Sequence, residues 1–258
     1  MRFSGVGRWA IVFAALLACG CAKQEKEKPL LYLYCGAGIR PPVSEMVAEF
    51  ERKQGVKMEC DYAGSEVLLS RIKLSRRGDL YMPGDARYVE QARREGLILS
   101  SVDACYWIPV IVVQKGNPKG IESVADLTKP GLRVGLGDPT ACAIGKISAR
   151  VLKKNNIAEE DIEPNIVFRS LTVNELGVHI KTGKIDAAIV WDGIANLYAD
   201  VGDVVRIPPE QNVVSTVPLA VLKFSQHPEL AKKFQQFVTS QRGKEIFAKY
   251  GYTTERPE

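Results

Sequence analysis

Residues 30–42 read LLYLYCGAGIRPP, and this stretch decides the fold. Its first six residues are five apolar side chains and a cysteine, a run typical of a strand buried on both faces. Gly-Ala-Gly at residues 36–38 ends the strand, and apolar residues from Val43 to Phe50 recur at the spacing of one helical face. The stretch therefore predicts a strand, a turn of small residues and a helix that ends at Gly55.

The turn at residues 36–38 has two interpretations. Small residues leave backbone N–H groups uncovered at a helix start, where unpaired donors and the helix dipole favour an anion. They also let a helix and a strand pack closely, without any ligand. This stretch by itself is compatible with both.

The first 29 residues are expected to lie outside the fold. Arg2 and Arg8 precede an apolar run at residues 9–18, which is shorter than the roughly 20 residues of a membrane span. We predict a signal peptide over 1–18 and a charged tether over 19–29. LLACGC at residues 16–21 resembles a bacterial lipobox, which implies a lipid on Cys19 and fits Cys21 less well; a plain secretory signal is the alternative.

Composition argues against two classes of partner. The formal net charge is +5, or +3 without Arg2 and Arg8, and no basic run stands out, so nucleic acid is not expected. The two histidines, His179 and His227, are far apart and have no ligand cluster around them, so a zinc site is not expected. The four cysteines after the tether allow three pairings, and the sequence chooses none of them. They are Cys35, Cys60, Cys105 and Cys142.

Predicted strands and helices alternate along residues 30–258, which favours an α/β fold with parallel-rich sheets covered on both faces. One more strand and helix pair follows the first directly, with a strand over 56–62 and Ser65 as the N-cap of the next helix. Ligands of such sheets lie beyond the carboxyl ends of the strands. The loops that fall there are 36–38, 64–65, 139–145 and 191–193, and small residues dominate them.

Several motifs in order resemble the periplasmic molybdate-binding receptors of bacterial ABC importers, of the type II solute-binding fold. The resemblance covers residues 30–255. The motifs are LYCGAG, EFERKQGVKMECDYAGS, GDLYMPGD, LRVGLGDPTACAIGK, AAIVWDG and GKEIFAKYGYTTE. The resemblance implies two lobes, residues 30–110 with 214–258 and residues 111–213. WIPVIVVQ (107–114) and VPLAVLKF (217–224) would be the crossing strands, and the cleft would close as a hinge.

The resemblance also implies which residues hold the ligand. The serine of the family's first loop falls on Gly38, which lacks the hydroxyl, and the tyrosine that reaches the anion falls on Trp191, whose indole only donates. The second-loop serine, Ser65, is intact. The implied binding residues are Gly36, Ala37, Gly38, Gly64, Ser65, Ala143, Ile144, Gly145, Val173 and Trp191.

A site built from donors suits a fully deprotonated dianion, because a protonated phosphate brings an O–H that needs an acceptor. Asp138 and Asp192 flank two of the loops, and we expect both to cap turns. If either faced the anion instead, its carboxylate would repel a dianion and favour a protonated ligand such as phosphate. Arg40 is either an added cation of the site or an exposed residue of the helix surface.

Three other classes of function would each require different features of the sequence. An enzyme would need a base beside Cys35 or Cys142, and neither histidine lies in a candidate loop. A metal receptor would need tyrosines, histidines or carboxylates in the cleft. Tyr198 and Asp200 are the only group of these types near a candidate loop. An envelope lipoprotein acting through protein contacts would leave the cleft empty.

The expected function follows mainly from the resemblance. We expect a monomeric, lipid-anchored, exported receptor, periplasmic or at the cell surface, without catalysis, cofactor or metal site. It would capture a tetrahedral oxyanion, first of all molybdate or tungstate, and present it to the permease and ATPase of an ABC importer. The alternatives are sulfate, phosphate or phosphonate, ferric iron, or a role outside transport.

Overall fold

The computed structural model describes residues 28–256. The predicted signal peptide (1–18) and the two candidate lipid-bearing residues, Cys19 and Cys21, lie outside the described residues. Among the described residues, no helix combines the length and the apolar character that crossing a membrane requires.

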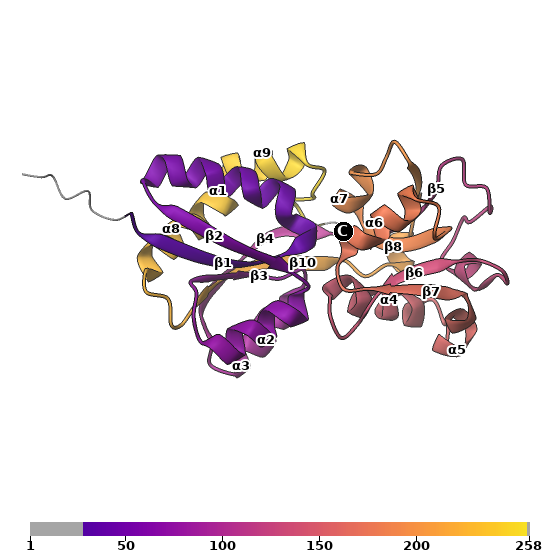
Figure 1. Ribbon diagram of the computed structural model, residues 1–258, viewed down its shortest axis with the longest axis horizontal. Coiled ribbons are helices and arrows are strands. Elements are labelled where there is room, and N and C mark those ends of the chain that lie inside the picture. The colour runs from indigo at the N-terminus through magenta and orange to yellow at the C-terminus, as the bar shows by residue number, and fades with distance from the viewer. Residues whose placement is uncertain (1–27, 257–258) are drawn as a thin grey trace, which may run out of the picture.

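Two five-stranded sheets form two lobes that lie end to end (Figure 1). The order of the first sheet is β2-β1-β3-β10-β4, and the order of the second is β7-β6-β8-β5-β9. In the first sheet β2, β1 and β3 are parallel and β10 runs antiparallel to its neighbours; in the second, β7, β6 and β8 are parallel and β5 is antiparallel to β8 and β9. The strands are β1 (Leu30–Gly36), β2 (Lys57–Ala63), β3 (Leu80–Met82), β4 (Ile98–Trp107), β5 (Pro109–Gln114), β6 (Val134–Gly137), β7 (Ile166–Ser170), β8 (Ala187–Trp191), β9 (Gly202–Arg206) and β10 (Ser215–Leu222).

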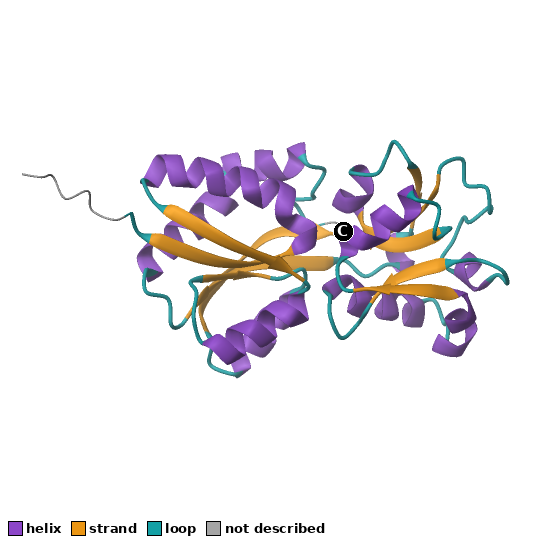
Figure 2. Ribbon diagram, viewed as in Figure 1, coloured by secondary structure: helices purple, strands orange, loops and turns teal. Residues whose placement is uncertain are grey.

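Helices cover both faces of each sheet (Figure 2). This confirms the predicted α/β class. The helices of the first lobe are α1 (Arg40–Gln54), α2 (Ser65–Ser75), α3 (Ala86–Arg94), α8 (Pro228–Thr239) and α9 (Gln241–Lys249). Those of the second lobe are α4 (Ala143–Lys154), α5 (Glu159–Ile162), α6 (Val173–Lys181) and α7 (Asp192–Asn196). Short 3-10 turns are η1 (Ala37–Ile39), η2 (Ala125–Thr128), η3 (Glu163–Asn165) and η4 (Pro209–Gln211).

The first strand and helix form as their pattern predicts. β1 is buried from Leu31 onward except for the partly exposed Tyr32, because it lies between β2 and β3. The predicted apolar face of α1, from Val43 to Phe50, is buried. Gly55 ends the helix with a φ of 65°, the left-handed conformation that glycine adopts without strain.

The connections between the lobes differ from the expected crossing strands. Residues 107–114 are not one strand: Trp107 ends β4 in the first sheet and Pro109 starts β5 in the second. The break occurs at Ile108, which exchanges hydrogen bonds with Asp192 instead of a neighbouring strand. Residues 107–114 thus cross between the lobes at this break, whereas VPLAVLKF (217–224) stays in the first lobe, since most of it is β10 and pairs with β3 and β4. The second connection is residues 207–214, and the exact lobe limits given above remain a prediction.

The end of the chain lies at the same junction. The backbone N–H of Tyr106 donates to the carbonyl of Thr253 at 2.7 Å, and the Thr253 hydroxyl donates to the Asp192 carboxylate at 3.3 Å. The Tyr252 hydroxyl donates to the carbonyl of Gly38. The C-terminal segment therefore contacts both lobes.

Asp79 holds the far end of the first sheet together. Its buried carboxylate accepts hydrogen bonds from the Tyr32 N–H at 2.8 Å and from the Ser225 hydroxyl at 2.5 Å. Tyr32 lies in β1, and Ser225 follows β10, which is far along the chain. The carboxylate thus links β1 to the segment that follows β10.

Asp79→Ala is expected to lower the free energy of unfolding by about 1–3 kcal/mol, because it leaves the Tyr32 N–H buried without an acceptor. Urea unfolding measures this loss. Ser225→Ala removes one of the two bonds and should cost less. An Asp79→Ala protein as stable as the parent would contradict this role.

Candidate functional site

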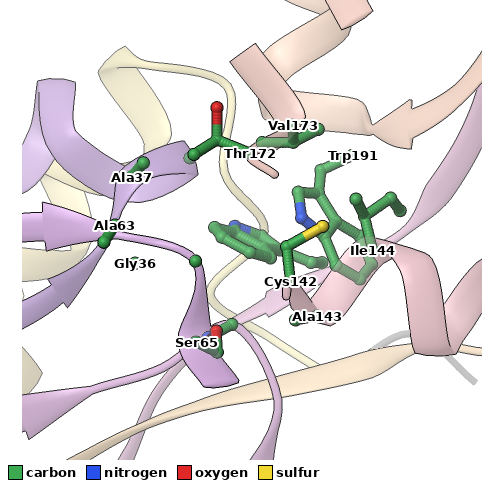
Figure 3. A pocket seen from close by; sticks show the side chains of 14 residues that line it. Gly36, Ala37, Ala63, Ser65, Cys142, Ala143, Ile144, Thr172, Val173 and Trp191 are labelled. Carbon is green, nitrogen blue, oxygen red and sulfur yellow. Dashed lines mark hydrogen bonds between the residues drawn. The ribbon is translucent and has the colours of Figure 1, made fainter. Parts of the chain in front are cut away.

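A small cavity of about 20 Å³ lies between the lobes, beyond the carboxyl ends of the parallel strands (Figure 3). Every predicted site residue except Gly145 lines it. The lining also includes residues that sequence reasoning did not select, namely Ala63, Gly84, Trp107, Cys142 and Thr172. The full lining is Gly36, Ala37, Gly38, Ala63, Gly64, Ser65, Gly84, Trp107, Cys142, Ala143, Ile144, Thr172, Val173 and Trp191.

Gly145 lies behind this cavity. It packs against the backbone of Gly137 and Asp138, and a side chain there would collide with them. It lines a separate apolar pocket beneath α4 instead. Its position in the first turn of α4 explains why the loop pattern selected it, and its packing explains why it is glycine.

Three helices begin at the cavity without a cap from the side chain of their own N-cap residue. The N-caps of α2, α4 and α6 are Gly64, Cys142 and Thr172, and none of their side chains accepts a hydrogen bond from the helix. By contrast, Asp85, which follows the lining residue Gly84, caps α3, and Ser240 caps α9. The first N–H groups of α2, α4 and α6 and their dipoles are therefore directed at the same small space.

Ser65 has a different role from the N-cap that we predicted. It is the first residue of α2, and its hydroxyl oxygen accepts a hydrogen bond from the Gly84 N–H at 3.0 Å. Its carbonyl accepts from the Tyr81 hydroxyl at 2.8 Å. Because Gly84 supplies the oxygen with a donor, the hydroxyl proton is left for an acceptor in the cavity.

Two tryptophans form one wall. The ring centroids of Trp107 and Trp191 lie 4.7 Å apart, and both residues are almost fully buried. Trp107 ends β4 in one lobe and Trp191 ends β8 in the other. The available signal for Trp107 was its place at the start of WIPVIVVQ, but we expected that segment to be a continuous crossing strand.

The rings also explain the glycine at position 38. A Cβ there would lie 2.7 Å from Cγ1 of Val173 and 3.2 Å from Cη2 of Trp107. A serine does not fit without moving these neighbours. The resemblance implies a serine hydroxyl at this position, but Val173 and Trp107 fill the space that it would need.

No residue of the lining carries a formal charge at neutral pH. Burial raises the pKa of the Cys142 thiol to about 11, and the thiol contacts the carbonyl oxygens of Asp138 and Ser170 at 3.5 and 3.6 Å.

Asp138 caps its turn through Thr140, as expected. Asp192 bonds to the Ile108 N–H of the connection, and its burial raises its pKa. Arg40 is exposed and its guanidinium lies over the Tyr62 ring at 4.9 Å.

Residues 28–256 contain no cluster of metal-ligand side chains and no disulfide. No three His, Cys, Asp or Glu side chains there are placed to hold a metal ion. Tyr198 donates its hydroxyl to the carbonyl of Asn174. The four described cysteines are free thiols.

The lobes are closed around the cavity. Lys146 of α4 forms an ion pair with Glu66 of α2 at 2.5 Å, and the Glu66 N–H donates to the carbonyl of Ala141 at 3.2 Å. Gly64 packs so closely against the carbonyls of Ala141 and Leu171 that a Cβ would meet them. These contacts join residues of different lobes, so they exist only in the closed arrangement.

Known proteins share this sequence pattern and this fold. A putative binding protein of Haemophilus influenzae is 28% identical over 225 residues, covering 86% of this chain and 90% of its own. The molybdate-binding protein ModA of Mycobacterium tuberculosis is 27% identical over 252 residues, covering 94% of each chain. The sulfate-binding protein SubI of M. tuberculosis has the same two-lobed fold, with a TM-score of 0.78 at 19% identity over 89% of this chain and 88% of its own. The model of the bacterial extracellular solute-binding protein family matches residues 31–253, and the chain belongs to this family.

Proposed function

We propose that this solute-binding protein captures a tetrahedral oxyanion dianion, first of all molybdate or tungstate, for an ABC importer. The observation that carries the proposal is the uncapped starts of α2, α4 and α6 around a cavity without a charged side chain. Members of this family bind solutes and are not enzymes.

The donors favour a fully deprotonated ligand. Backbone N–H groups only donate, the indoles of Trp107 and Trp191 only donate, and the Ser65 oxygen already accepts from Gly84. A dianion satisfies such groups without bringing a proton of its own. A monoprotonated phosphate would bring an O–H for which the side chains of the lining offer few acceptors, chiefly the Thr172 hydroxyl, and this would lower its affinity relative to sulfate or molybdate.

The choice among dianions rests on the relatives. The relative named for molybdate matches nearly the whole chain, and a protein named for sulfate shares the fold. Molybdate and tungstate are therefore proposed first and sulfate is the principal alternative. Ferric iron is a weaker candidate, because no tyrosine, histidine or carboxylate belongs to the lining.

The cellular setting is also part of the proposal. Family membership makes the protein extracellular or periplasmic. A lipid on Cys19 would anchor it to the membrane, where a monomer would deliver its ligand to the permease and ATPase of the importer. A purely structural envelope role would leave the cavity without a ligand.

Calorimetric titration with molybdate, tungstate, sulfate and phosphate at fixed pH and salt tests the function. We expect one-to-one binding, tight for molybdate or tungstate, weaker for sulfate and weakest for phosphate. Tight sulfate binding with weak molybdate binding would reassign the ligand within the same site. Absence of heat and of thermal stabilisation with all four would refute oxyanion binding.

Ser65→Ala is expected to weaken oxyanion binding by about 1–3 kcal/mol, since it removes a hydroxyl donor and leaves the Gly84 N–H without an acceptor. Titration calorimetry gives the affinity and urea unfolding separates the effect on stability. Ser44→Ala is the matched control, because Ser44 is exposed and does not belong to the lining. Equal affinity in both variants would remove Ser65 from the site.

Affinity for molybdate or sulfate is expected to stay constant from about pH 6 to about pH 9, because no lining group titrates there. It should fall as the pH approaches the Cys142 pKa of about 11, since a thiolate repels the anion. Titrations across this range check both parts. A steep change near pH 7 would show that an ionisable side chain contacts the ligand.

A further inference from the structure

The indole N–H of Trp107 lies buried without a hydrogen-bond partner in the described part of the chain. Trp107 is 2% exposed and lines the cavity. The other buried polar side-chain atoms in this condition belong to residues outside the lining; they are Tyr88, Ser148, Ser170 and Asn174. An indole N–H only donates, and leaving it unpaired in a buried place is costly. Because Trp107 belongs to the lining, a ligand in the cavity is a candidate for the acceptor that this N–H lacks.

The packing around Trp107 holds the ring in place. A Cβ on Gly84 would lie 2.6 Å from its Cζ3, and one on Gly38 would lie 3.2 Å from its Cη2. The ring is also tilted against Trp191 at 4.7 Å and against Tyr252 at 6.1 Å. The indole ring fills the space that Gly84 and Gly38 leave open. This packing fixes the orientation of the ring, and so of its N–H, without a ligand.

We propose that Trp107 is a ligand-binding residue whose Nε1–H donates to an oxygen of the bound oxyanion. This inference rests on the proposed function and adds a donor that the family resemblance does not supply. Trp107 belongs to β4 of the first lobe and Trp191 to β8 of the second. One anion would then receive an indole donor from each lobe, which compensates for the hydroxyl missing at Gly38 and couples occupancy to closure.

The same arrangement fixes the kind of ligand. Two indoles offer N–H groups on rigid rings and accept nothing, so they discriminate against an acid that keeps a proton. Their apolar faces exclude water from the cavity, which strengthens the remaining backbone donors. A small, fully deprotonated oxyanion meets both conditions.

The chain has three tryptophans, Trp9, Trp107 and Trp191, so the test is spectroscopic. A full-length Trp9→Phe protein retains only the two cavity indoles. In its ¹H–¹⁵N spectrum, we expect the indole resonance of Trp107 to move on saturation with molybdate or sulfate, as its proton gains a charged acceptor. Trp107→Phe and Trp191→Phe in this background assign the two resonances.

The affinity measurement uses two changes at position 107. Trp107→Phe is expected to weaken binding about tenfold to a hundredfold, the effect of losing a hydrogen bond to a charged group. Incorporation of 3-benzothienylalanine keeps the bicyclic shape and replaces the N–H by sulfur, so it should weaken binding to a similar extent without altered packing.

The outcomes are distinct. A parent that binds oxyanion while the Trp107 resonance stays in place and the benzothienyl variant keeps full affinity would overturn the role of Trp107 and leave the proposed function intact. A parent that binds none of the four oxyanions would overturn both. A moved resonance together with weakened binding in the benzothienyl variant would support the inference.

Discussion

Backbone N–H groups at a helix start need an acceptor, and the architecture of this protein follows from where those groups are left open. Three helices of the two lobes, α2, α4 and α6, begin at one cavity without a side-chain cap, whereas α3 and α9 are capped by Asp85 and Ser240. The positive partial charges at these helix starts favour an anion although the lining holds no lysine or arginine. In the proposed function, selectivity would come from the number and direction of the donors.

Bringing those donors together requires the lobes to approach closely, and glycine makes the approach possible. Gly64 meets the carbonyls of Ala141 and Leu171 across the cleft, and Gly38 meets Val173. The small residues that we associated with close packing of a strand and a helix thus mainly permit contact between lobes. The two interpretations of the first turn are compatible, because its small residues both leave N–H groups uncovered and allow close packing.

Local patterns predicted the parts of the fold and site that depend on neighbours in sequence. The β1 strand, the small turn and the α1 face could be inferred from residues 30–55, and so could the loops that line the cavity. Most of β4 was missed because its partly exposed stretch is polar and its pairing partner is β10, far along the chain. Trp107 and Gly84 were missed for the same reason, since their importance depends on distant partners.

The last described residues have a mechanical consequence. Thr253 bonds to Tyr106 beside one connection and to Asp192, while Tyr252 packs against Gly193 of the second lobe and bonds to Gly38 of the first. Three stretches of chain therefore meet at the axis about which the lobes would turn. Bending there must shear the contacts of the tail as well as rotate two connections. The resistance to such bending would thus be set partly by Tyr252 and Thr253, which do not belong to the lining of the cavity.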